Sequence, residues 1–70
     1  MKAKLKYNLV VHDDLYPKDT WVDVLGVSDM RVRKMIPNIE RNTESGQVAL
    51  LLPGRSHPLI HSLDLVEFGE

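Results

Sequence analysis

Residues 18–37, KDTWVDVLGVSDMRVRKMIP, decide the fold, because this stretch predicts two short helices joined by a tight turn. Asp19 or Thr20 can cap the first helix by accepting bonds from its free backbone N–H groups. Gly26 ends that helix, since glycine readily adopts the left-handed conformation that often follows one. The residues spaced i, i+3 and i+4 on its apolar face are Trp21, Val24 and Leu25.

A second helix follows over about residues 28–36, with Ser28 as its cap. Pro37 ends it, because proline cannot donate to the helical ladder and disfavours helical geometry at the preceding residue. The i, i+3, i+4 spacing returns here at Val32, Met35 and Ile36.

Two helices crossing at a tight glycine turn need a shared apolar core, and the pattern supplies one. We expect the core of this unit to consist of Trp21, Val22, Leu25, Val27, Val32 and Met35. The second helix then turns a polar face outward, where it can enter a DNA major groove. That face consists of Ser28, Asp29, Met30, Arg31, Arg33 and Lys34, and its three cations against one acid give a formal charge of +2.

The flanking residues predict a single α+β domain over residues 1–70. Apolar and polar residues alternate from Leu5 to Val11, which predicts an N-terminal strand before a polar loop. Residues 39–52 predict a β-hairpin, whose turn is the stretch from Asn42 to Gly46. Ser62 can cap a last turn of helix. The expected fold is a small winged helix-turn-helix: a strand, two short helices, a hairpin wing and a short C-terminal helix.

Residues 25–28 (LGVS) and 32–36 (VRKMI) resemble the helix-turn-helix of the MerR-like and phage excisionase families. In those families a hairpin wing follows the recognition helix, and the ending SLDLVEF over residues 62–68 is similar to the short closing helix of small excisionases. The resemblance implies a sequence-specific DNA-binding protein that regulates transcription or recombination, with double-stranded DNA as partner, no catalytic residues and possible dimers or cooperative oligomers on DNA.

The resemblance also implies a role for each cation of the recognition helix. Arg33 and Lys34 would read bases or phosphates, Arg31 would contact a phosphate, and Ser28 would anchor the DNA backbone. Asp29 and Met30 share that face. Arg41 and Arg55 extend the expected DNA-binding surface.

Other classes of site find little support in the sequence. The chain has no cysteine, which excludes disulfides and thiolate metal sites. His57 and His61 are expected to be surface residues, because Pro58 separates them and no third metal ligand is near. Asp13 and Asp14 are expected in a solvated turn. We expect no enzyme activity, cofactor, metal or small-molecule substrate, no membrane span, and a cytoplasmic location.

Two other functions remain open. The net charge of −1 and Glu44 at the expected hairpin tip favour a protein-interaction module, binding for example a repressor or polymerase subunit. The third reading is a strand-rich adaptor, for example a small barrel, in which the helical spacing of residues 18–37 is misleading.

Overall fold

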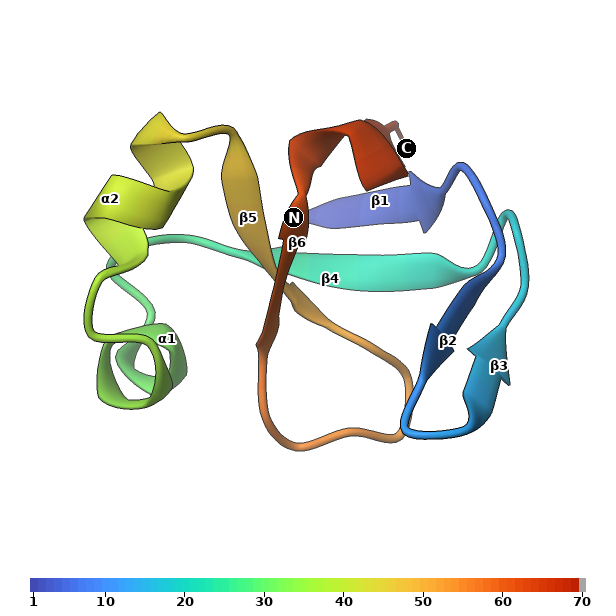
Figure 1. The fold of residues 1–70 in the computed structure, drawn as a ribbon, viewed down its shortest axis with the longest axis horizontal. Coiled ribbons are helices and arrows are strands. Elements are labelled where there is room, and N and C mark those ends of the chain that lie inside the picture. The colour runs from blue at the N-terminus through green and yellow to red at the C-terminus, as the bar shows by residue number, and fades with distance from the viewer. Residues whose placement is uncertain (70) are drawn as a thin grey trace.

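The computed structural model describes residues 1–69 and has an α+β fold, as the sequence predicts (Figure 1). Its main sheet has five antiparallel strands in the spatial order β6-β5-β4-β1-β7, and a two-stranded hairpin, β2–β3, forms a second sheet. The strands are β1 (Lys2–Leu5), β2 (Leu9–Val11), β3 (Asp14–Tyr16), β4 (Trp21–Leu25), β5 (Gln47–Leu51), β6 (Leu59–Ser62) and β7 (Val66–Phe68). The helices are α1 (Met30–Met35), α2 (Ile39–Glu44) and a single 3-10 turn, η1 (Leu63–Leu65).

The inner face of the bent sheet encloses the larger of two apolar clusters. Successive residues of a strand point to opposite faces, so Val22 and Leu50 face inward whereas Asp23 and Leu51 face outward. The hairpin β2–β3 closes this cluster through Leu9 and other half-buried residues. The fully buried members are Ala3, Leu5, Val22, Leu50, Leu52 and Val66.

The two helices form a smaller cluster on the outer face of the sheet. Val32 of α1 and Ile39 of α2 pack with Ala49 of β5, and all three side chains are buried. Leu25, the cross-strand partner of Ala49, packs against this cluster as well. Helices of six residues are not stable in isolation, so this packing holds them in place.

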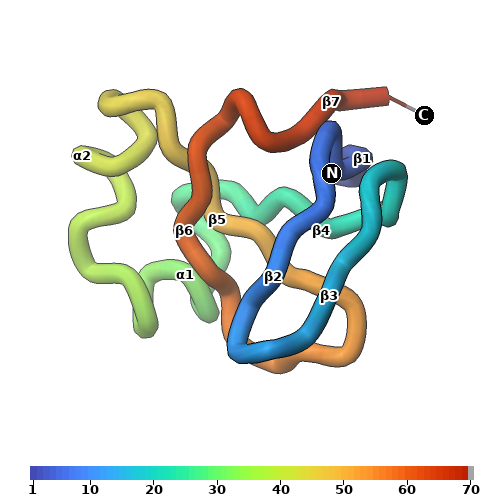
Figure 2. The backbone as a smooth tube through the Cα atoms, turned by 45° about the vertical axis from the view of Figure 1, so that its right-hand side comes forward, coloured from blue at the N-terminus to red at the C-terminus, as the bar shows by residue number. Residues whose placement is uncertain are grey.

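The helix pair and the hairpin lie at opposite ends of the molecule, as Figures 1 and 2 both show. The long loop between β5 and β6 runs to the tip of the hairpin β2–β3. The helix pair covers the part of the outer face where Leu25 pairs with Ala49. The other end of that face carries Trp21, and no helix of residues 1–69 packs on it.

The first predicted helix is wrong, because Trp21–Leu25 is the strand β4. Val22 and Val24 alternate with Trp21 and Asp23, so the segment also fits a period of two. Pairing with β1 on one side and β5 on the other satisfies its backbone groups, which decides for the strand. Gly26 does not adopt a left-handed conformation, so the expected sharp helical turn is absent there.

The second predicted helix is confirmed with narrower bounds, because α1 spans Met30–Met35 within the predicted residues 28–36. Its cap is Asp29 rather than Ser28, and the Asp29 carboxylate accepts the backbone N–H of Arg31. The helix ends before Pro37, as predicted.

The predicted hairpin over residues 39–52 is only half right. Ile39–Glu44 is the helix α2, because the buried Ile39 anchors it in the outer cluster, and only Gln47–Leu51 is extended. Gly46, with a φ of +83°, reverses the chain between them. The strand β5 pairs with β4 and β6 instead, so the expected wing is absent.

Both termini also depart from the prediction. The expected strand from Leu5 to Val11 is split into β1 and β2 by a bend. Ser62 does cap a turn, accepting the Asp64 N–H, but that turn is the short 3-10 helix η1, and the chain then continues as β7. The third reading, a strand-rich domain, describes the sheet better, although α1 belongs to the first reading and α2 was predicted by none of the three.

Candidate interaction surfaces

The cations of the predicted recognition helix are exposed, yet two of the three are paired within the helix region. We call Arg31, Arg33 and Lys34 the α1 basic patch. The guanidinium of Arg31 lies 3.0 Å from the Asp29 carboxylate, and that of Arg33 lies 3.2 Å from the Glu40 carboxylate. No ion pair involves Lys34 among residues 1–69. The patch therefore presents less free positive charge than its sequence suggests.

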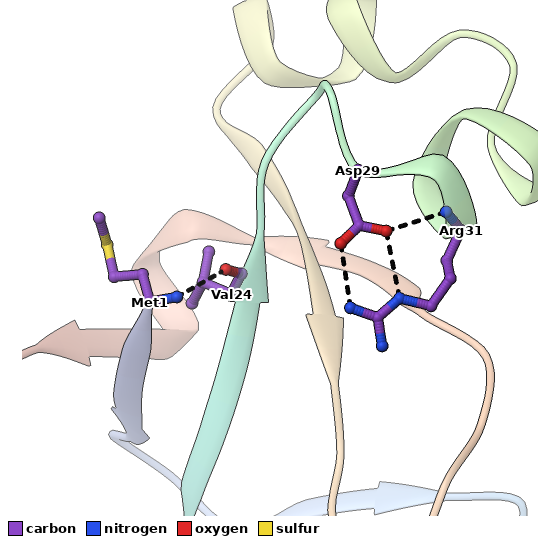
Figure 3. A network of polar contacts seen from close by, with 4 residues as sticks. All are labelled: Met1, Val24, Asp29 and Arg31. Atoms are coloured by element: carbon purple, nitrogen blue, oxygen red, sulfur yellow. Dashed lines mark hydrogen bonds and ion pairs between the residues drawn. The ribbon is translucent and has the colours of Figure 1, made fainter.

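Asp29 occupies the start of α1, where a DNA phosphate was expected to bind. Figure 3 shows its carboxylate facing Arg31, with one oxygen accepting both the backbone N–H and the Nε–H and the other accepting Nη2. Hydrogen bonds from Arg31 lower the pKa of Asp29 below its usual value. A carboxylate held ionised at this place repels a phosphate, and Asp29 occupies the cap position where Ser28 was expected.

The other predicted DNA contacts are divided between two parts of the molecule. Met30 has 85% of its surface exposed and lies on α1 with the basic patch. Arg41 lies on α2, near the same end of the molecule. Arg55 lies instead in the loop between β5 and β6, against the hairpin β2–β3. One continuous DNA-binding surface that includes all the predicted residues is therefore not formed.

Arg55 fastens the β5–β6 loop to the hairpin. Its Nε donates to the Tyr16 hydroxyl at 2.8 Å, and its Nη2 donates to the Val11 carbonyl at 2.9 Å. The same Nη2 lies 3.0 Å from the Asp14 carboxylate. Asp14 is thus part of an ion pair rather than only of a solvated turn, and Arg55 has a structural role that its sequence context did not reveal.

The uncovered part of the outer sheet face carries an exposed aromatic side chain. Trp21 was expected in the core, but 43% of its surface is exposed. Its cross-strand partner on β1 is Lys4, and the partner of Lys4 on β7 is Glu67. Asp23 pairs in the same way with Lys2 and Leu51, which gives a second row of three. We call these six residues the Trp21 face.

The charges of the Trp21 face are largely satisfied within the face. The ammonium of Lys2 lies 2.8 Å from the Asp23 carboxylate, and its hydrogen bond lowers the pKa of Asp23 below its usual value. The ammonium of Lys4 lies 5.0 Å from the centre of the Trp21 ring, within the range of a cation–π contact. Because β1 lies between β4 and β7, these lysines lie inside the sheet and not at its edge.

The surface is hollowed on both sides of the Trp21 indole. A hollow of about 230 Å³ lies between Trp21 and the start of the β5–β6 loop, with Lys2, Leu51 and Pro53 in its wall. A smaller one of about 130 Å³ lies between Trp21 and Phe68, with Lys4 and Glu67 in its wall. Trp21 is therefore a ridge between two shallow hollows, each lined by both apolar and charged side chains.

His61 differs from its prediction as a surface residue. Its side chain is partly buried, its Nε2 has no hydrogen-bond partner, and burial lowers its pKa below the usual 6.5. His57 is exposed, as expected. In the described part of the chain no group of three or more metal-ligating side chains comes together. No helix within residues 1–69 has the length and apolar character needed to cross a membrane.

Comparisons with protein-family models, with curated proteins and with solved structures found no match for this chain. The resemblance to the MerR-like and excisionase families therefore stays a prediction, and in the structure α1 is the part of the motif that has the expected conformation.

Proposed function

We propose that this chain is a protein-interaction module and that the Trp21 face is the surface that contacts its partner. The observation that carries the proposal is the exposed Trp21 side chain between two hollows, on the part of the outer sheet face that lies beyond the helix pair. Tryptophan combines a large apolar area with one N–H donor and few rotatable bonds, so it is common among the residues that dominate protein interfaces.

The charge distribution favours a protein partner over DNA. Lys2 is already paired with Asp23, and the carboxylate of Glu67 lies across the strand from Lys4. DNA affinity at physiological salt comes mainly from cations that neutralise phosphates, and this face offers no excess of them. A partner segment that inserts apolar side chains into the two hollows and leaves its polar groups at the rim fits the face better.

A selection of random peptides displayed on phage tests this proposal, followed by affinity measurements on the best binder. The variant Trp21→Ala is expected to bind about 30-fold more weakly, which corresponds to the loss of about 2 kcal/mol at an interface centre. Glu67→Lys, which reverses an exposed charge without removing apolar packing, is expected to weaken binding as well. Circular dichroism of both variants serves as the control that they keep the fold.

Leu15 provides the matched control, since 61% of its surface is exposed and it lies on the hairpin rather than on the Trp21 face. Leu15→Ala should bind the selected peptide as the unchanged chain does. If the Trp21 and Leu15 variants lost the same affinity, or if Trp21→Ala left the affinity for the selected peptides unchanged, this face would be ruled out as the contact surface.

DNA binding by the α1 basic patch is the second candidate, and the helical conformation of Met30–Met35 with its exposed cations supports it. This candidate predicts binding to duplex DNA that weakens steeply with salt. Replacing Lys34, which has no ion pair within the described residues, should then reduce the affinity more than replacing Arg31. Duplex binding that is indifferent to all three cations of the patch, or absent at low salt, would dismiss it.

A further inference from the structure

A third hollow lies between the tip of the hairpin β2–β3 and the β5–β6 loop, and it shares Gly54 and Arg55 with the larger of the two hollows beside Trp21. Its volume is about 330 Å³, the largest of the three hollows described here. The residues in its wall are His12, Gly54, Arg55, Ser56, His57 and Leu59. We call it the loop hollow.

The polar side chains of the loop hollow share one chemistry, because each offers a hydrogen-bond donor, and Leu59 adds an apolar wall. Arg55 is permanently charged, Ser56 has a hydroxyl, and His12 and His57 each carry ring nitrogens that can donate. No carboxylate of residues 1–69 belongs to the wall. The acids nearest in the chain are Asp13 and Asp14, which follow His12 in the hairpin, and Asp14 is engaged by Arg55.

The position of Arg55 is fixed before any ligand binds. Its side chain is only 22% exposed, and three hydrogen bonds from Nε and Nη2 hold the guanidinium against Tyr16, Val11 and Asp14. Nη1 donates to no group of residues 1–69, so its two N–H groups remain for another acceptor. A donor that is already ordered loses little conformational entropy when it binds a ligand.

The two histidines reach the hollow from different segments. His12 lies in the two-residue turn of the hairpin, where it and Asp13 have φ values of 49° and 69°. The left-handed region is unfavourable for both residue types, and turns of this kind favour asparagine and glycine. His57 comes from the β5–β6 loop, which Arg55 ties to the hairpin. The hydrogen bonds of Arg55, which we call the Arg55 clamp, therefore hold two loops with donor side chains around the loop hollow.

From this arrangement we propose that the loop hollow is a binding site for the phosphate group of a small phosphomonoester. Fixed guanidinium N–H groups, imidazole N–H groups and a hydroxyl are the donors that phosphate oxygens accept from. The volume admits a phosphate together with a short organic group. The Asp14 carboxylate offsets part of the Arg55 charge, so the expected affinity is in the millimolar range, about −4 kcal/mol. None of the six residues of the Trp21 face lines this site, although Gly54 and Arg55 also line the neighbouring hollow beside Trp21.

Titration of the isotope-labelled full chain with inorganic phosphate and with glycerol phosphate, followed by amide NMR shifts, tests this inference. Sodium chloride holds the ionic strength constant, and sodium acetate serves as an anion of different geometry. We expect saturable shifts at Gly54, Ser56 and His57 with either phosphate. A tighter fit for glycerol phosphate would identify the organic group as part of the ligand, whereas equal affinities would limit the site to phosphate itself.

The double variant His12→Ala, His57→Ala should weaken phosphate binding about tenfold, the effect of losing about 1.4 kcal/mol. Both histidines are exposed, so the variant should keep the fold, which its amide spectrum reports directly. Lys18→Ala, which removes an exposed cation outside the hollow, should bind phosphate unchanged. Shifts that never saturate, that chloride reproduces, or that survive in the histidine variant would overturn the proposal.

Discussion

Replacing Arg55 with methionine should destabilise the fold more than its place in a surface loop suggests. Methionine keeps much of the length and apolar contact of the arginine stem but removes every hydrogen bond of the guanidinium. The bonds to the Tyr16 hydroxyl and the Val11 carbonyl are part-buried, and each contributes about 1.5 kcal/mol when the donor is charged. The pair with Asp14, whose side chain is 68% exposed, adds less than about 1 kcal/mol.

These contributions give an expected loss of about 3 kcal/mol for Arg55→Met. A domain of this size loses about 4–8 °C of melting temperature per kcal/mol, so Tm should fall by about 12–24 °C. Thermal unfolding followed by circular dichroism measures this change. Hydrogen exchange adds a local readout, because the amides of the hairpin β2–β3 should lose protection before those of β4.

Arg41 offers a matched control for the same substitution. It lies exposed on α2, and its side chain makes no hydrogen bond or ion pair with residues 1–69. Arg41→Met should therefore leave Tm within about 2 °C of the unchanged chain, as surface substitutions usually do. If the two variants melted together, or if the hairpin amides kept their protection in Arg55→Met, the clamp would contribute nothing to stability.

Three further changes test other parts of the structure. Val32→Ala should lower the free energy of unfolding by about 2 kcal/mol, because it removes two buried methyl groups. Hydrogen exchange should show that the amides of both helices open first. A uniform loss of amide protection across the sheet would contradict a separate outer cluster. The lowered pKa of His61 means that the folded state binds a proton less readily than the unfolded chain does. The free energy of unfolding therefore keeps its full value above pH 6.5 and declines as pH falls below it. Urea unfolding at pH 7 and pH 5 should show a smaller decline for His61→Leu than for the unchanged chain, and equal declines would assign the effect to other groups. Asp29→Asn keeps a capping side chain whereas Asp29→Ala does not, so only the alanine variant should lower Tm. If both variants had the same Tm, the cap would contribute nothing to stability.

The sequence predicted the class of fold but not the arrangement of its elements. Residues 21–25 satisfy both a helical spacing and a strict alternation, because Trp21 and Leu25 are four apart while Val22 and Val24 are two apart. The sheet partners that select the strand come from β1 and β5, which lie about twenty or more residues away in the sequence. Local periodicity contains no information about those partners.

α1 was predictable because its signals are local. Pro37 and the spacing of Val32 and Ile36 lie within six residues of one another, and the observed cap Asp29 is the neighbour of the predicted cap Ser28. α2 was missed because a tertiary contact holds it in place: its first residue, Ile39, packs against Ala49 of β5. A turn-like composition at its end, with the left-handed Gly46, suggested a hairpin instead of a helix followed by a reversal.

The candidate surfaces were predicted least well, because exposure depends on which face of an element other elements cover. Because residues 21–25 form a strand, Trp21 and Asp23 share the face opposite to Val22, and the Trp21 side chain lies outside the core. The role of Arg55 needs three partners on the hairpin that no spacing rule connects with the β5–β6 loop. Alternation of Trp21 with the valines was the one sequence signal that pointed to the exposed face.

The fluorescence of Trp21, the single tryptophan of the chain, offers the most direct test of the Trp21 face as a contact surface. Burial of the indole by a bound peptide from the random selection should shift its emission to shorter wavelength, saturating in step with the binding curve, whereas duplex DNA at low salt should leave the emission unchanged. An emission spectrum that stays fixed while the peptide binds, or that responds to duplex DNA alone, would contradict the account.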